Sequence, residues 1–205
     1  MKITPITFQN NFFSISSYSK INFRGGKNIC QRKIIDVGFK NDRIASILSN
    51  FTESHFVLDG VKINSMEGFL QSLKTSNHQE QKEICQLIGY DAKKVGNKLK
   101  KQDSYNPQIL FWQNKAYKRN SKEYQKLLKR AFKAKYFADE RFQRALFQTK
   151  SAELTHTIGK NSIYETILTE REFIENLKIL RDNFWINNIE LKLQRFLNKF
   201  LRSFK

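Results

Sequence analysis

Glu67, Gln71 and Lys74 stand at positions i, i+4 and i+7 of the segment Ser65–Lys74. If the segment is helical, this spacing places the three polar side chains on one face. Ser65 is a good N-cap, and the apolar residues recur at three- and four-residue spacing on another face: Met66, Phe69, Leu70 and Leu73. A carboxylate and an amine would then line one cleft.

This pair of groups suits the cleavage of an N-glycosidic bond. That reaction needs a proton for the leaving base, stabilisation of positive charge at the anomeric carbon, and a nucleophile. Glu67 can serve as the acid/base or stabilise the oxocarbenium-like centre. Lys74, once neutral, can attack the anomeric carbon and form a Schiff base. Spacing alone equally fits a weak stabilising network on an exposed helix face.

The elements that must position these groups are mostly helices. With 205 residues, 40% of them hydrophobic, the chain is long enough for one domain with a core. We predict two short strands at 56–58 and 61–63 around an Asp-Gly turn, and a further strand at 33–39. Helices are predicted after Ser65 and over 79–88, 91–101, 108–119, 123–138, 140–148 and 170–184. The expected fold is α+β and mostly α, a helical domain with a small N-terminal β-hairpin or sheet.

Both ends of the chain differ from this domain. Residues 1–30 are rich in Asn, Ser and Lys and contain no acid, so we expect a flexible leader. The domain itself is expected over 31–184. Residues 185–205 predict a basic amphipathic helix, which either packs its apolar face on the domain or contacts an anionic membrane surface or a partner.

Positive charge is concentrated in one stretch. The chain carries 37 Lys and Arg against 19 Asp and Glu, a net charge of +18. Between Lys93 and Lys135 there are 14 Lys or Arg and two acids, so this stretch contributes +12 of that charge. Such clustering favours a phosphate-binding surface, although a basic composition also serves solubility alone.

Several other classes of protein are not indicated. Cys30 and Cys85 are far apart in the sequence, which is neither a disulfide framework nor a metal-binding spacing. There is no signal-peptide pattern and no apolar run long enough to span a membrane, so we expect a cytoplasmic protein. The sequence has no Walker A loop, no dinucleotide-binding glycine fingerprint and no Gly-x-Ser-x-Gly elbow. We therefore expect neither a metal nor a cofactor.

An ordered set of short words resembles the NADAR family over roughly residues 34–181. The words are Leu48-Ser49-Asn50-Phe51, Leu58-Asp59-Gly60 and Ser65-Met66-Glu67 with Gln71 and Lys74, followed by Trp112, Lys135-Tyr136, Phe142, Leu146 and Thr149. NADAR proteins include N-glycosidases of riboflavin-pathway intermediates and enzymes that remove ADP-ribose from modified guanine. A Gly-rich word common near the end of the family is absent here.

The resemblance implies roles for seven residues. Glu67 and Lys74 match the family's catalytic pair, with the lysine in the covalent role. The other five are implied to bind substrate: Asn50 and Phe51 in a loop, Gln71 in the cleft, Trp112 as an aromatic beside the ligand, and His156 where a carboxylate is common in the family. Phe51 and Trp112 could equally be core aromatics, Asn50 a turn residue and His156 a structural histidine.

The sequence therefore predicts an N-glycosidase, most specifically an ADP-ribosyl glycohydrolase acting on base-linked ADP-ribose. Its substrate would be an ADP-ribosylated nucleotide or nucleic acid, or a small phosphorylated nucleoside-like metabolite. The alternative is a non-catalytic module that binds nucleic acid or ADP-ribose.

Overall fold

The computed structural model describes residues 33–38, 42–99, 108–184, 186–190, 192–193 and 196. The chain divides into two units, Met1–Gln31 and Arg32–Lys205, and all described residues belong to the second. The predicted leader at 1–30 lies outside the described residues.

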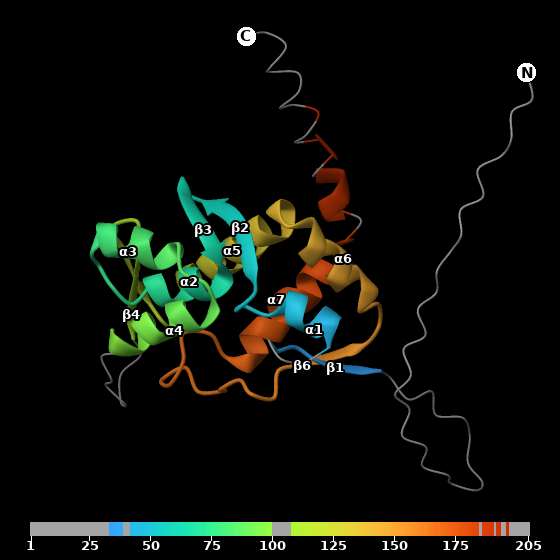
Figure 1. The fold of residues 1–205 in the computed structure, drawn as a ribbon, viewed down its shortest axis with the longest axis horizontal. Coiled ribbons are helices and arrows are strands. Elements are labelled where there is room, and N and C mark those ends of the chain that lie inside the picture. Colours follow the sequence, from blue (N-terminus) through green and yellow to red (C-terminus); the bar gives the residue numbers. More distant parts are fainter. Residues whose placement is uncertain are drawn as a thin grey trace, which may run out of the picture. The chain divides into compact units, whose positions relative to one another are not determined.

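Helices dominate the described part of the chain, and three two-stranded sheets accompany them (Figure 1). The helices are α1 (Arg43–Leu48), α2 (Met66–Ser72), α3 (His78–Cys85), α4 (Gly89–Lys98), α5 (Lys122–Ala138), α6 (Glu140–Gln148) and α7 (Glu170–Asp182). The strands are β1 (Ile34–Asp36), β2 (Glu53–Leu58), β3 (Val61–Ser65), β4 (Ile109–Trp112), β5 (Lys115–Lys118) and β6 (Glu153–Thr155). The predicted α+β, mostly α, fold class is confirmed.

The hairpin of β2 and β3 forms around the predicted Asp-Gly turn. Asp59 and Gly60 both have positive φ, at 49° and 80°, as a tight two-residue hairpin turn requires. Along β2 the side chains alternate between exposed and buried, so Phe56 and Leu58 enter the core. This buried face packs against α5, which lies behind the hairpin in Figure 1.

Helix α2 is buried along its whole length between β3, α3 and α4. Its N-cap is Ser65, as predicted: the Ser65 hydroxyl accepts a hydrogen bond from Gly68 N at 2.9 Å and donates one to Leu87 O at 2.8 Å. A Cβ at Gly68 would lie 2.7 Å from that same carbonyl oxygen, so only glycine lets the last turn of α3 and the residues after it come this close. A helix enclosed in this way holds its side chains in fixed directions.

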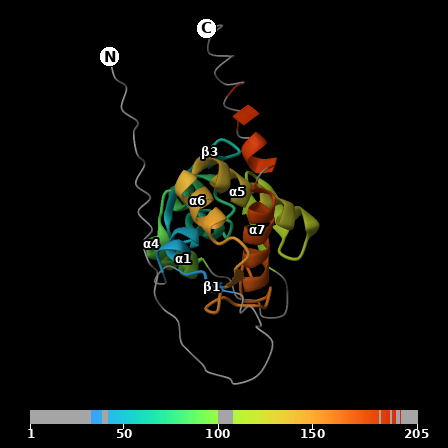
Figure 2. The same cartoon turned by 90° about the vertical axis from the view of Figure 1, so that its right-hand side faces the viewer.

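Strands β1 and β6 join the beginning of the domain to its C-terminal half. They pair in parallel with Ile35 opposite Leu154, next to α1 and below α7 in Figure 1. After β6 the chain runs through residues 156–169 without a helix or strand and then enters α7. Figure 2 shows α7 beside α5, with which it packs. Thr169 and Glu172 form a capping box at the start of α7.

The prediction of a helix over 108–119 is wrong, because this segment is the antiparallel hairpin β4–β5. Gln113 and Asn114 have positive φ, at 50° and 61°, and turn the chain back on itself. Leu110 and Trp112 alternate into the core, which is a strand's period rather than a helix's. The Phe111 N–H donates to Leu73 O at 2.8 Å and so fixes the hairpin to the end of α2.

Other predicted elements differ mainly at their ends. The helices predicted over 79–88, 91–101, 123–138, 140–148 and 170–184 correspond to α3, α4, α5, α6 and α7. Of the strand predicted over 33–39, of which residues 33–38 are described, the structure forms 34–36, and neither α1 nor β6 was predicted. These two short elements contain only six and three residues, too few for a periodic pattern to show.

Only part of the predicted C-terminal helix is described. Residues 186–190, 192–193 and 196 are helical, and Ile186, Ile189, Leu193 and Phe196 are exposed. Asn187 is buried and donates from Nδ2 to Leu180 O at 3.2 Å, which attaches the first turn to α7. Contact of this helix with an anionic surface stays a prediction.

Candidate active site

A cavity of about 600 Å³ opens between α2, α4 and the segment 156–169. Its wall contains six of the seven side chains singled out in the sequence: Asn50, Phe51, Glu67, Gln71, Lys74 and His156. Further lining residues come from β1, α4, the start of β4 and the segment before α7, among them Asp36, Tyr90, Lys93, Asn97, Gln108 and Thr166. The volume is that of a typical small-molecule site.

Glu67 and Gln71 form a buried pair on α2. Only 5% of Glu67 and 2% of Gln71 is exposed, and Gln71 Nε2 donates to Glu67 Oε1 at 2.7 Å. Because a carboxylate only accepts, this bond fixes which end of the Gln71 amide faces Glu67. No described residue hydrogen-bonds Glu67 Oε2, which leaves that oxygen for a ligand or a water molecule.

Lys74 lies just after α2, one turn beyond Gln71. The helix ends at Ser72, but Lys74 N still donates to Gln71 O at 3.2 Å and keeps the side chain on the cavity side. Its Nζ donates to Gly96 O on α4 at 2.8 Å. Lys93, also on α4, places its Nζ 3.5 Å from Glu67 Oε1. One carboxylate and two amines thus share this wall.

The loop before β2 supplies the next part of the wall. The Asn50 carbonyl accepts from Glu67 N at 2.9 Å and links this loop to the first turn of α2. Asn50 Oδ1 is buried and has no hydrogen-bond partner among the described residues. The Phe51 ring meets Tyr90 edge-on, with centroids 5.1 Å apart, and both rings line the cavity. An aromatic pair of this kind offers apolar surface to a planar base.

A fully buried lysine supports this loop from behind. Lys135 Nζ on α5 donates to Ser49 O at 3.2 Å and lies 4.5 Å from the centroid of the Phe142 ring. Burial lowers the pKa of Lys135 to about 8, an effect that nearby Asp139 partly opposes. In the sequence, Lys135 stood out only as one charge of the basic stretch and as part of the family resemblance.

Trp112 is in the core and does not line this cavity, so its place beside a ligand stays a prediction. Trp112 is 1% exposed, packs edge-on against Phe69 and donates from Nε1 to Asp59 Oδ2 at 2.8 Å. The reason is the alternation of β4, which points Leu110 and Trp112 inward together.

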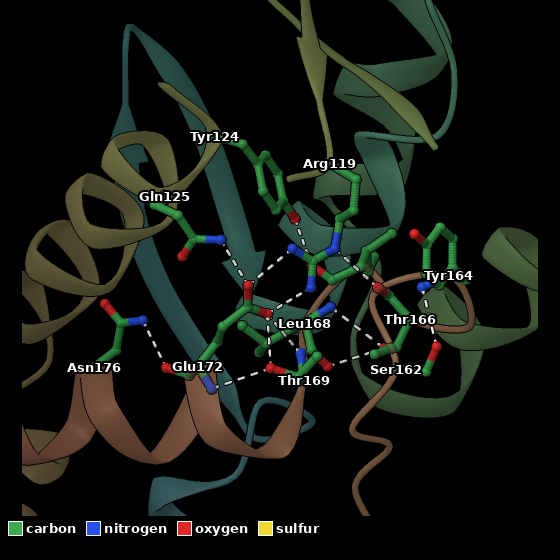
Figure 3. Close-up of polar contacts among 11 residues, drawn as sticks. Arg119, Tyr124, Gln125, Ser162, Tyr164, Thr166, Leu168, Thr169, Glu172 and Asn176 are labelled. Atoms are coloured by element: carbon green, nitrogen blue, oxygen red, sulfur yellow. Dashed lines mark hydrogen bonds and ion pairs between the residues drawn. The ribbon is translucent and has the colours of Figure 1, made fainter. Parts of the chain in front are cut away.

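The part of the cavity wall just before α7 is held by an ion pair between a buried arginine and a half-buried glutamate (Figure 3). Arg119, which is 0% exposed, donates from Nη1 and Nη2 to the two carboxylate oxygens of Glu172 at 2.8 and 2.5 Å. Its Nε donates to Thr166 O at 2.9 Å, and the Tyr124 hydroxyl donates to Ile167 O at 2.6 Å. These bonds fix the segment that lines the cavity before α7.

Glu172 is half-buried, and its surroundings favour the charged form of its carboxyl group. Burial alone would raise the pKa of Glu172, but the hydrogen bonds from Arg119 and from the Thr169 backbone outweigh it and hold the pKa below its ordinary value. Gln125 Nε2 donates a further bond at 2.6 Å. The network therefore joins the residue after β5 to α5 and α7 around one carboxylate.

Sequence reasoning missed several residues of the wall. Tyr90 and Asn97 carried no signal, and Lys93 was counted only as one charge in the basic stretch. Within the described ranges, no three His, Cys, Asp or Glu side chains come together where they could hold a metal ion. In the same residues no helix is both long and apolar enough to cross a membrane.

Comparison with known proteins places the chain in a family. The model of the family described as bacteriophage protein GP30.3 matches residues 42–182, which is most of the chain. The chain belongs to the GP30.3 family. A relative in Enterobacteria phage T4, an uncharacterized 17.1 kDa protein in the Gp30-rIII intergenic region, is 34% identical over 137 residues, 66% of this chain and 89% of its own.

The fold of this GP30.3-family chain is similar to that of the Escherichia coli protein YbiA. The two structures superpose with a TM-score of 0.53 at 18% identity, over 79% of this chain and 90% of YbiA. YbiA is a NADAR-family protein, so the fold predicted from the sequence resemblance, a NADAR-like one, is confirmed.

Proposed function

We propose that the chain is an N-glycosidase that cleaves a phosphorylated nucleoside-like substrate, with Lys74 as nucleophile and Glu67 as acid/base. The observation that carries the proposal is the buried Glu67–Gln71 pair beside Lys74 on one wall of an open cavity. A weak surface network is the competing explanation of the same spacing, and it fits side chains exposed to water. Here two of the three are buried.

The chemistry follows from the groups on this wall. Because only a neutral amine is nucleophilic, the reaction begins with transfer of a proton from Lys74 to the Glu67 carboxylate. Lys74 Nζ then bonds to the anomeric carbon as the N-glycosidic bond breaks, and Glu67 supplies the proton that the leaving base takes. The bond between the anomeric carbon and the ring oxygen then breaks, a proton moves from the Lys74 nitrogen to that oxygen, and a protonated Schiff base between Lys74 and the opened sugar results. Water hydrolyses it and restores the lysine.

The remaining lining residues suit the two ends of such a substrate. Phe51 and Tyr90 provide an aromatic surface for the base, and Lys93 and Lys160 provide positive charge for phosphate. An ADP-ribosyl group combines these features, so an ADP-ribosyl glycohydrolase is the specific activity we propose. Lys122, Lys126 and Lys129, exposed along α5, favour the version in which that group is attached to nucleic acid.

The test is incubation with an ADP-ribosylated guanine oligonucleotide in the presence of borohydride, followed by intact-mass measurement. We expect release of ADP-ribose without reductant and a stable protein adduct with it. Lys74→Ala should lose both, and Glu67→Gln should slow formation of the adduct. Lys94→Ala is the matched control, because Lys94 is exposed on α4 and does not line the cavity.

Other results would redirect the proposal. Turnover by Lys74→Ala at the wild-type rate would remove the covalent lysine from the mechanism. Binding of the oligonucleotide with neither adduct nor release would instead support a non-catalytic binding module. Activity on free nucleotides alone would identify a small phosphorylated metabolite as the substrate.

A further inference from the structure

The imidazole ring of His156 is held on three sides at the edge of the cavity. Nδ1 is hydrogen-bonded to Val37 O, at the end of β1. The ring meets Phe173 of α7 edge-on, with centroids 5.0 Å apart. On its other side, a Cβ at Gly159 would lie 2.8 Å from His156 Cδ2, so the ring fits there only because residue 159 is glycine. These contacts fix the direction of the ring.

The contact with Val37 also fixes the position of the proton. A carbonyl oxygen only accepts hydrogen bonds, so Nδ1 carries the hydrogen. In the neutral imidazole the other nitrogen, Nε2, then has a free lone pair. Nδ1 faces Val37, and Cδ2 faces Gly159. Nε2 lies on the side of the ring away from Cγ. Among the described residues, none hydrogen-bonds Nε2, and His156 lines the cavity.

We propose that His156 is the proton acceptor for the water that hydrolyses the Schiff base on Lys74. This inference rests on the proposed glycosidase function and goes beyond a substrate contact for His156. Both residues line the same cavity, and the preset tautomer makes Nε2 ready to accept a proton without rearrangement.

The proton balance of the step is complete within these groups. The water oxygen bonds to the iminium carbon, the C=N double bond becomes single, and the proton lost by water moves to Nε2. The carbinolamine nitrogen takes this proton back from His156. Its C–N bond then breaks, the hydroxyl proton passes to the lysine nitrogen, and the sugar aldehyde leaves. His156 ends neutral and Lys74 ends as an ammonium.

The test compares His156→Asn with the wild-type chain on the same oligonucleotide. Asn can donate a hydrogen bond in place of Nδ1 but cannot accept a proton at neutral pH. We expect turnover to fall by about 100-fold or more, the usual range for loss of an acid/base group. The Schiff base should still form, so the fraction of protein trapped by borohydride at steady state should rise above that of the wild type. This accumulation separates a role in hydrolysis from a purely structural one.

Control variants separate a role of His156 in hydrolysis from other causes of lost turnover. His55→Asn changes an exposed histidine outside the cavity and should leave turnover and trapping unchanged. His156→Gln provides a second variant should the Asn variant unfold. Turnover within a few fold of wild type in a folded variant, or lost turnover without accumulated adduct, would overturn the inference while the glycosidase function stands. Absence of release and adduct in the wild type itself would show that the proposed function fails, and the inference with it.

Discussion

At the scale of single residues, the site depends on close contact between α2 and α4 at Gly96. A Cβ at this position would lie 1.8 Å from Gln71 Oε1, and the Gly96 carbonyl accepts from Lys74 Nζ. A residue with no side chain thus lets the Gln71 amide stay against Glu67 and also positions the amine.

Gly96→Ala should therefore damage both stability and activity. The methyl group forces Gln71 away from Glu67, so we expect a loss of about 1–3 kcal/mol in the free energy of unfolding from overpacking. Release of ADP-ribose should fall roughly 100-fold, since small displacements of reacting groups are costly. Urea unfolding and turnover measure the two effects. If steric overlap is the cause, adding Gln71→Ala should restore most of the stability, whereas additive losses would contradict it.

The sequence predicted which residues line the cavity better than it predicted the elements that surround those residues. Six of its seven candidates line the cavity, since the helical spacing of Glu67, Gln71 and Lys74 and the family words need no tertiary information. Their chemical roles stay predictions. Trp112 does not line the cavity because its direction depends on belonging to a strand. Lys93 was missed because its place opposite Glu67 depends on how two helices pack.

At the scale of elements, periodic patterns predicted the long helices, and the turn at Asp59 and Gly60 predicted the first hairpin. The second hairpin was mistaken for a helix because neither of its turn residues, Gln113 and Asn114, is a glycine, although both adopt positive φ. Asn tolerates positive φ, so the turn is sterically possible. The sequence pattern nevertheless did not predict it. Tertiary hydrogen bonds, such as that from Phe111 N to Leu73 O, also favour the hairpin over a helix.

Glu172→Gln tests the element-level claim that one ion pair holds the cavity wall to α5 and α7. The change keeps the size of the side chain but leaves the Arg119 charge buried without its counter-charge, so we expect a loss of about 3 kcal/mol in unfolding free energy. Amide hydrogen exchange in 166–169 should accelerate, because Arg119 and the helix cap both hold this segment.

A matched double variant checks the cause. If an uncompensated charge is responsible, replacing both Arg119 and Glu172 by Met should cost less than Glu172→Gln alone. Unchanged exchange in 166–169 would contradict the anchoring role even if the protein were destabilised.

At the scale of the whole molecule, the distribution of charge differs from what the sequence count implies. Of the basic stretch, Arg119 and Lys135 are buried, and Arg130 and Lys133 pair with Asp59 and Glu190. Part of the +12 charge is thus used for internal structure. The proposed phosphate-binding surface is smaller than the stretch, and its exposed lysines are distributed over α4, β5 and α5.

Lys135 also makes the stability of the whole molecule depend on pH in a predictable direction. Burial lowers its pKa in the folded state to about 8, against 10.5 as the ordinary value. Between these values the unfolded chain holds a proton that the folded chain has lost, so stability rises with pH through this window. Relative to Lys135→Met, which has no such group, the wild type should gain about 2 kcal/mol in unfolding free energy between pH 7.5 and 10.

The difference between the two proteins isolates Lys135 from the other groups that titrate in the same range. Tyr124, whose pKa burial raises, acts in the opposite direction but is common to both. Urea unfolding at each pH provides the measurement. Near neutral pH the Met variant should be as stable as the wild type or more so, because it removes a buried charge. A constant difference across the range would mean that Lys135 keeps its ordinary pKa in the folded protein, and that its ammonium is better solvated than its burial behind Ser49 implies.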